Sequence, residues 1–341
     1  KGSEMSAIEA VMPKTALDVF VYDTTKDSDG GAWRKRTQHT SWYNEKLNTT
    51  TRGSRKEFPA VAVIVAEQYA VTIYDGDDPA MPMWMVFDGL ASLDMLSRHS
   101  LGNKAIGALN AQLAVASGQY GVGVIDFVGD TGFRFREALS RTYSGYYLGG
   151  IVDRNSGKDW DGTDPKGTTI DDNVNDIAMT VLPNAPIDAD TGLPTPTVVI
   201  ATQSGVTVIQ NNGSVRNLSG GVYGTVNAFG EYFVAKGSGD DLSVMRWDST
   251  DTIINYTKGT YRFNGNPATG YHPFLYGNGG KILAVDHTKR IHHLTGVTGL
   301  TTWDIDGGVS DRNSLQNNIK TNFNTGWMVG DTKLATLSDT D

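Results

Sequence analysis

Residues 113–132 read LAVASGQYGVGVIDFVGDTG, and residues 198–215 read VVIATQSGVTVIQNNGSV. The segments GVGVI (121–125) and GVTVI (205–209) align with one gap. Each copy joins a strand of small residues to a strand of alternating apolar residues through a polar turn that contains Gly. This pattern is typical of a β-hairpin with one buried face.

The hairpin pattern recurs along the chain. Further copies are VIVAEQYAVTIYD (63–75), YFVAKGSGDDLSVMRWD (232–248) and ILAVDHTKRIHHL (282–294). Upstream partner strands with short turns are expected at 106–109, 226–229, 274–276 and 327–329. The unit is therefore a meander, and its copies lie roughly 35–55 residues apart, as the blades of a β-propeller do.

The number of hairpins predicts an all-β fold, a β-propeller with about seven blades of four-stranded antiparallel meanders. The hairpins counted lie near residues 19, 63, 115, 199, 233, 283 and 334. The strand at 16–21 has no partner before it and the last hairpin is incomplete, so we expect N- and C-terminal strands to share one blade. A β-sandwich or two small β domains is the alternative, because short, evenly spaced strands serve those folds too.

The expected organisation is one domain. Residues 1–14 are interpreted as a tag remnant or short N-terminal segment, and residues 15–341 as a single propeller domain. A polar loop inserted at about 150–172 and a Pro-bounded turn at 183–196 account for the wide interval between the two opening copies.

Composition excludes several classes of function. The chain has no Cys, which rules out disulfides and cysteine-based zinc sites. Its net charge of −9 repels phosphate backbones, so nucleic-acid binding is not expected. No apolar run approaches the ~20 residues of a membrane-spanning helix, so membrane insertion is not expected either.

The segment DSDGGAW (27–33) resembles the Asp-box turn of sialidase-type propellers, one residue short before Trp33. In that motif the Asp accepts N–H groups of the turn, Gly supplies a positive φ, and Trp packs beneath the hairpin. The resemblance therefore implies a structural role rather than hydrolysis.

One segment has the spacing of a calcium loop. Asp159, Asp161 and Asp164 place oxygen ligands at alternating positions, but the twelfth position, where an EF-hand has Glu, is Ile170. An ordinary Asx-rich loop is favoured, and a structural Ca²⁺ is the one cofactor considered. His292 and His293 are adjacent on a strand and face opposite sides, so they do not share a metal.

No catalytic constellation stands out. A glycosidase needs two carboxylates at one centre, and no spacing singles out such a pair. The acidic groups at 75–78 and 304–306 are interpreted as turns. Trp42, Tyr43 and Trp160 are candidates for contact with a glycan or partner protein, since exposed aromatics serve both purposes. Packing beneath long loops is favoured for Trp42 and Tyr43.

Four stretches carry a resemblance to a known family. They are LDVFVYDTTKDSDGGAWRKRTQHTSWYNE (17–45), EFPAVAVIVAE with VTIYDGDDPAMPMW (57–84), NVNDIAMTVLPNAPIDADTGLPTPTVVIATQSGVTVI (173–209) and GWMVGDTKLATLSDTD (326–341). They resemble virion structural proteins of marine tailed bacteriophages, of the tail or tail-fibre type. In that family lectin-like modules follow the propeller region, so the resemblance implies a piece of a longer virion protein. It supplies no catalytic residues.

Three hypotheses follow from the sequence. The first is a non-enzymatic tail or tail-fibre adaptor, made in the bacterial cytoplasm and assembled into the virion. It would contact other tail proteins and take part in host-surface recognition. Homo-oligomers are common among such proteins. The second is a propeller that binds or degrades host polysaccharide, which would place two carboxylates about 5–10 Å apart beside aromatics in the central funnel. The third is a periplasmic or sensor propeller that binds another protein.

Overall fold

The computed structural model describes residues 13–89, 95–96, 102–137, 145–162 and 167–237, and beyond them only the backbone of strands between 242 and 319. The fold is all-β, with antiparallel sheets of four to six strands. Within each sheet the strands follow chain order, so each sheet is a meander, as predicted. In the second sheet two added strands increase the number to six.

The first two sheets contain β1 to β10. The first sheet consists of β1 (Asp18–Asp23), β2 (Val61–Ala66), β3 (Ala70–Asp75) and β4 (Met83–Asp88). The second consists of β5 (Asn103–Leu109), β6 (Gln112–Ser117), β7 (Val122–Asp126), β8 (Thr131–Phe135), β9 (Gly145–Tyr147) and β10 (Trp160–Asp161). Short 3₁₀ helices accompany them: η1 (Thr24–Lys26), η2 (Ala32–Arg36) and η4 (Ile151–Asp153).

Three further sheets follow. The third consists of β11 (Val174–Thr180), β12 (Thr197–Thr202), β13 (Gly205–Ile209) and β14 (Val215–Ser219). The fourth consists of β15 (Tyr223–Phe229), β16 (Tyr232–Gly237), β17 (Leu242–Trp247) and β18 (Ile253–Asn255). The fifth consists of β19 (Lys281–Val285), β20 (Arg290–Thr295), β21 (Gly299–Asp304) and β22 (Asn317–Ile319).

The predicted hairpins are confirmed as β2–β3, β6–β7, β12–β13, β16–β17 and β19–β20. The upstream strands at 106–109 and 226–229 are confirmed as parts of β5 and β15, whereas those expected at 274–276 and 327–329 lie outside the described residues. Between β5 and β6 the turn consists of Asn110 and Ala111, with φ of 50° and 64°. Two positive φ values in a two-residue loop are the mark of a type I′ turn, whose twist matches the right-handed twist of the paired strands.

The separate counting of hairpins near residues 19 and 63 is wrong. β1 pairs with β2 from Asp18–Ala66 to Asp23–Val61, so both belong to one sheet. The long connection 24–60 separates these two paired strands in the sequence by about the distance expected between two blades. Among the described strands, the first sheet reaches four strands with residues 18–88 alone, so the expected sharing of a blade by N- and C-terminal strands stays a prediction. Residues 320–341 lie outside the described part of the chain.

The insertion at about 150–172 is not one continuous loop. Its start forms η4, and β10 pairs with β9 at the edge of the second sheet. Trp160 pairs in register with Tyr147, and their rings lie 5.2 Å apart edge to face. Because this segment can bury aromatic side chains, part of it extends the sheet.

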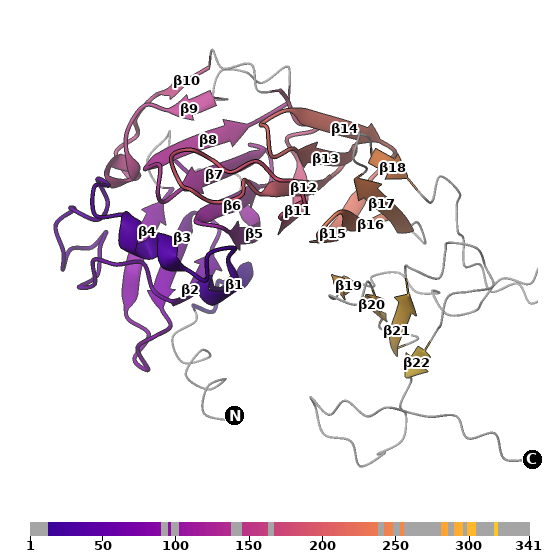
Figure 1. Ribbon diagram of the computed structural model, residues 1–341, viewed down its shortest axis with the longest axis horizontal. Helices are drawn as coiled ribbons and strands as arrows, with labels where there is room; N and C mark the ends of the chain where they lie inside the picture. The colour runs from indigo at the N-terminus through magenta and orange to yellow at the C-terminus, as the bar shows by residue number, and fades with distance from the viewer. Residues whose placement is uncertain are drawn as a thin grey trace, which may run out of the picture.

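The sheets follow one another along an arc from β1–β4 (indigo) to β19–β22 (yellow) (Figure 1). The first strand of each sheet lies against the first strand of the next, in the order β1, β5, β11, β15 and β19. Separate apolar clusters fill the space between the first and second, second and third, and third and fourth sheets. The core is therefore divided into layers between sheets.

At two of the junctions, neighbouring first strands are joined by aspartate side chains rather than by a backbone ladder. Asp18 Oδ2 accepts the N–H of Ile106 on β5 at 2.8 Å, and its Oδ1 accepts the next N–H of its own strand. Asp176 repeats both contacts between the third and fourth sheets, with Oδ2 2.9 Å from Val226 N. Both Asp residues stand opposite an Ala near the end of the second strand, so they occupy equivalent positions.

The Asp-box-like segment joins the first sheet to the second. Asp27 Oδ2 accepts Tyr22 Oη at 2.6 Å and Trp33 Nε1 at 2.7 Å, while Oδ1 accepts Asn110 N at 2.8 Å. Gly30 and Gly31 have positive φ, and Trp33 is fully buried, as the resemblance implied. The N–H of the turn itself is accepted by Asp29 instead. The role is structural, and it reaches across two sheets.

The connection 24–60 also covers the outer edge of the first sheet. Arg154 donates to Val86 O on β4 and forms a two-pronged pair with Glu45 at 2.7 and 2.8 Å. Arg52 lies fully buried over the Trp84 ring and donates to Trp84 O on the same strand. Burial lowers the pKa of Arg52 to about 10. These contacts use the free hydrogen-bonding groups of an edge strand, which would otherwise be open to another chain.

We expect Asp176→Ala to lower the free energy of unfolding by about 1–3 kcal/mol, because it leaves the buried N–H of Val226 without its acceptor. Asp190→Ala, which removes an exposed carboxylate, is the control and should change it by less than about 0.5 kcal/mol. Urea denaturation measures both. Equal effects of the two substitutions would show that Asp176 does not join the sheets.

Candidate functional site

The aromatic residues singled out in the sequence are mostly part of the core. Trp42 is fully buried, and its Nε1 donates to Phe127 O at 2.8 Å. Trp160 is also buried, below the guanidinium of Arg134. Tyr43 is half-buried beside Trp42. Packing beneath the loops, the favoured interpretation for Trp42 and Tyr43, is confirmed, and Trp42 and Trp160 offer no exposed ring to a glycan or partner.

The calcium candidates are only partly described. Asp159 and Asp161 flank Trp160 at β10, which is a paired strand, and Asp164 lies outside the described residues. Among the residues that the structure describes, no three His, Asp or Glu side chains are arranged to hold a metal. His292 and His293 lie on β20, as expected, but their side chains are outside the description.

The acidic turn at 75–78 is structural. Arg55 bridges Asp75 and Asp77 at 2.8 and 2.7 Å, and Asp77 accepts the N–H groups of Ala60 and Val61.

In the described part of the chain, no helix has the length and apolar character needed to cross a membrane.

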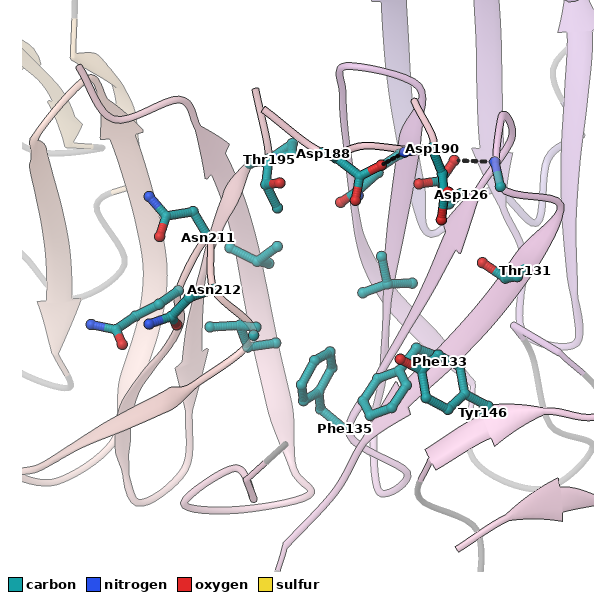
Figure 2. Close-up of a pocket in the computed structure, with 18 residues that line it drawn as sticks. Asp126, Thr131, Phe133, Phe135, Tyr146, Asp188, Asp190, Thr195, Asn211 and Asn212 are labelled. Carbon is teal, nitrogen blue, oxygen red and sulfur yellow. Dashed lines mark hydrogen bonds between the residues drawn. The ribbon is translucent and has the colours of Figure 1, made fainter. Parts of the chain in front are cut away.

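A cavity of about 410 Å³ opens between the second and third sheets (Figure 2). Four segments distant in sequence line it: the end of β7 with its following turn, β8 with Tyr146 of β9, the connection 181–196, and the turn after β13. All three turns follow the first or third strand of a meander, so they lie at the same end of the sheets. We call this cavity the intersheet cleft.

One end of the cleft is acidic. Figure 2 shows Asp126 and the connection residues Asp188 and Asp190 close together there. Asp126 Oδ1 accepts Val128 N and Gly129 N, both at 2.8 Å. Asp188 Oδ1 accepts Asp190 N at 3.0 Å and Thr191 N at 2.8 Å. Each carboxylate is thus fixed by the turn that it begins, which is the usual behaviour of Asx turns.

Burial raises the pKa of Asp126, and the negative charge of Asp188 adds to this, against hydrogen bonds from Gly129 N and Val128 N. The proton is therefore bound more tightly than on an ordinary Asp. A carboxyl group with a raised pKa next to a second carboxylate is an arrangement that occurs at functional sites.

The opposite wall provides amides and the far end provides aromatic rings. Asn211 and Asn212 lie in the turn after β13, on the third-sheet side (Figure 2). Phe133 is the centre of an aromatic group, 4.4 Å from the Phe135 ring and 5.0 Å from the Tyr146 ring. Tyr146 is 38% exposed, so a ligand can reach its face.

The cleft combines carboxylates, amides and aromatic faces, and no Lys, Arg or His is among the described residues that line it. The three carboxylates would repel an anionic ligand. Carboxylates and amides hydrogen-bond to hydroxyl groups, and aromatic rings pack against C–H faces, so the chemistry suits a hydroxyl-rich ligand without negative charge.

The sequence analysis did not identify this site. Its residues come from segments that no local pattern connects, and Asp126 and Gln210 belong to the two repeated stretches, which were interpreted as purely structural. One local signal was available: each stretch ends its second strand with a polar side chain directly after an apolar run, IDF at 125–127 and VIQ at 208–210.

Comparison with known proteins gives no assignment. No family model matches the chain, and no curated protein matches it.

We expect Asp126→Asn to raise the melting temperature at neutral pH. The pKa of Asp126 is higher in the folded than in the unfolded chain, so the folded state holds the proton more tightly and stability falls as pH rises through the interval between these two pKa values. Asn keeps the Oδ1 acceptor for Val128 and Gly129 but cannot ionise. Its advantage should disappear below the ordinary Asp pKa of about 3.9.

Melting curves between about pH 3 and 8 measure this difference. Asp23→Asn is the contrasting variant, because the hydroxyl of Thr25 lowers the pKa of Asp23 and the sign of the pH effect is reversed. A wild-type protein that is more stable than Asp126→Asn at neutral pH would contradict the expected cost of the buried carboxylate.

Proposed function

We propose that the chain is a non-enzymatic binding domain built as a β-propeller, which serves as an adaptor in a phage tail and binds host-surface carbohydrate through the intersheet cleft. The resemblance of four stretches to tail proteins supports the virion context. The chemistry of the cleft is the observation that carries the binding function.

The propeller arrangement is supported by the order of the sheets. Consecutive meanders that pack first strand against first strand, with an apolar layer between sheets, are what blades around an axis require. The arc in Figure 1 has the same order. A rigid ring of this kind suits an adaptor because it holds loops in fixed positions.

The cleft favours carbohydrate over other classes of ligand. Sugars present hydroxyl groups at their edges and C–H groups on their faces, and the cleft offers acceptors and amides at one end and an aromatic wall at the other. The described residues of its lining include no basic side chain, which argues against nucleotides and phosphorylated ligands.

Polysaccharide hydrolysis is the second candidate, and one observation favours it. Asp126 has a raised pKa and faces the charge of Asp188, which resembles the acid and its partner in glycosidases. We place it second because Asp188 lies in a surface connection and both carboxylates already accept backbone N–H groups.

We expect the protein to bind uncharged glycans on a glycan array, and Tyr146→Ala to weaken that binding about tenfold, the loss of one stacking ring. Tyr146→Phe keeps the ring and should bind like the wild type. Leu148→Ala is the matched control, since this residue is 62% exposed on the same segment and is not part of the cleft.

The same glycans, incubated with the protein and assayed for new reducing ends, separate the two candidates. Release of reducing ends that Asp126→Asn abolishes would replace the binding function by hydrolysis. Absence of binding to every glycan, or equal loss in Leu148→Ala and Tyr146→Ala, would rule out the cleft as the binding site.

A further inference from the structure

We infer that the intersheet cleft selects acetamido sugars, in chains longer than one residue, and that the side-chain amide of Gln210 is the selecting group. This inference rests on the proposed function, because it names the class of carbohydrate for the same cleft.

The starting observation is a buried donor without an acceptor. Gln210 lines the cleft and is only 3% exposed, yet its Nε2 has no hydrogen-bond partner among the residues that the structure describes. The side-chain oxygen is engaged, since it accepts from the Ser214 hydroxyl. An unsatisfied buried amide costs about 1–3 kcal/mol, so it calls for an explanation such as a ligand that supplies the acceptor.

The backbone holds this amide in place. Gln210 N donates to Ser214 O and Gly213 N donates back to Gln210 O, both at 2.8 Å, which closes the turn after β13. The apolar strand before it, GVTVI, is buried throughout. Gln210 therefore stands at a fixed point between a rigid strand and a closed turn, and its donor is positioned before any ligand arrives.

The groups around Gln210 indicate what the ligand must offer. It must present an acceptor to Nε2 and donors to the carboxylates Asp126 and Asp188, whose Oδ1 atoms already accept backbone N–H groups. An acetamido group has a carbonyl oxygen, an N–H and a methyl group. The apolar side chains of Val198 and Ile209, which also line the cleft, suit the methyl group.

Charge narrows the choice of sugar. The described lining of the cleft carries three carboxylates and no basic side chain, so uronic and sialic acids are disfavoured. A bare hexose has hydroxyl groups for the carboxylates and C–H faces for the aromatic rings, but no methyl group to pack against Val198 and Ile209. The acetamido sugar is the class that satisfies the donor, the acceptors and the apolar wall together.

The aromatic wall indicates a chain of sugars. Val124, Phe133 and Tyr146 are cross-strand partners on β7, β8 and β9, so their side chains stand in a row on one face of the second sheet. Neighbouring strands are ~4.8 Å apart, so the row extends about 10 Å. This length exceeds a single pyranose ring and leads from the cleft toward the exposed Tyr146.

The test uses three tetrasaccharides that share a β-1,4 linkage. The tetramers of N-acetylglucosamine and of glucose are uncharged, and the deacetylated glucosamine tetramer is positively charged. Calorimetric titration of the wild type should give an affinity for the acetylated tetramer at least about tenfold above that for the glucose tetramer. The acetylated monosaccharide should bind more weakly than its tetramer by a similar factor.

Gln210→Met, which keeps the length of the side chain but removes the donor, should bind the acetylated and glucose tetramers with equal affinity. Its stability in urea should stay close to that of the wild type, because the unsatisfied donor is removed together with the acceptor of the Ser214 hydroxyl. Gln203→Ala is the control, an exposed Gln at the opposite end of the same hairpin, and should keep the full preference.

The possible failures are distinguishable. Equal affinity of the wild type for acetylated and glucose tetramers overturns the inference and leaves the carbohydrate-binding function standing. Strongest binding to the deacetylated tetramer shows that the carboxylates, not Gln210, select the ligand, and also overturns it. No binding to any of the three, together with a blank glycan array, overturns both. A preference that survives Gln210→Met removes Gln210 from the selection.

Discussion

Two of the junctions between sheets depend on one kind of contact, an aspartate carboxylate that accepts a backbone N–H of the neighbouring sheet. The first strand of each sheet has a free edge, and its buried N–H groups need partners. Asp18 and Asp176 supply them to Ile106 and Val226. Because the contact recurs at equivalent positions, it fixes the first sheet against the second and the third against the fourth in the same way. The second and third sheets, which enclose the intersheet cleft, are held together by the apolar cluster between them.

The loops around the cleft are held by hydrogen bonds from other loops at the same end of the sheets. Asn110, in the two-residue turn between β5 and β6, donates from its backbone to Asp27 and from its amide to Pro194 O. Arg36 donates to Thr191 O from the connection 24–60. The segment that carries Asp188 is thus attached to the second sheet and to the connection of the first. The negative charge of Asp188 raises the pKa of Asp126, so the two carboxylates repel each other. The packing of the sheets does not need this repulsion, and unfavourable contacts of this kind are common at binding sites.

Local pattern predicted the hairpins because apolar alternation and Gly-containing turns are properties of neighbouring residues. It miscounted the sheets where the connection 24–60 imitated the distance between repeats, since pairing of β1 with β2 depends on distant residues. It kept Trp42 open as a surface residue, although the Phe127 carbonyl that receives its N–H lies in another sheet. The cleft could not be predicted, because Asp126, Asp188 and Gln210 meet only after the register between sheets is set.

The connections between first and second strands differ greatly in size while the strands that they join do not. Two residues suffice in the second and fourth sheets, whereas the first and third carry 24–60 and 181–196. All of them emerge at one end, where the cleft opens. A sequence exchanged in the connection 181–196 would alter the cleft and leave the strand pairs of the third sheet intact. The connection 24–60 has no such freedom, because it carries the buried residues that join the first sheet to the second. The lining of the cleft can thus change in one loop without a change in the strands that support it.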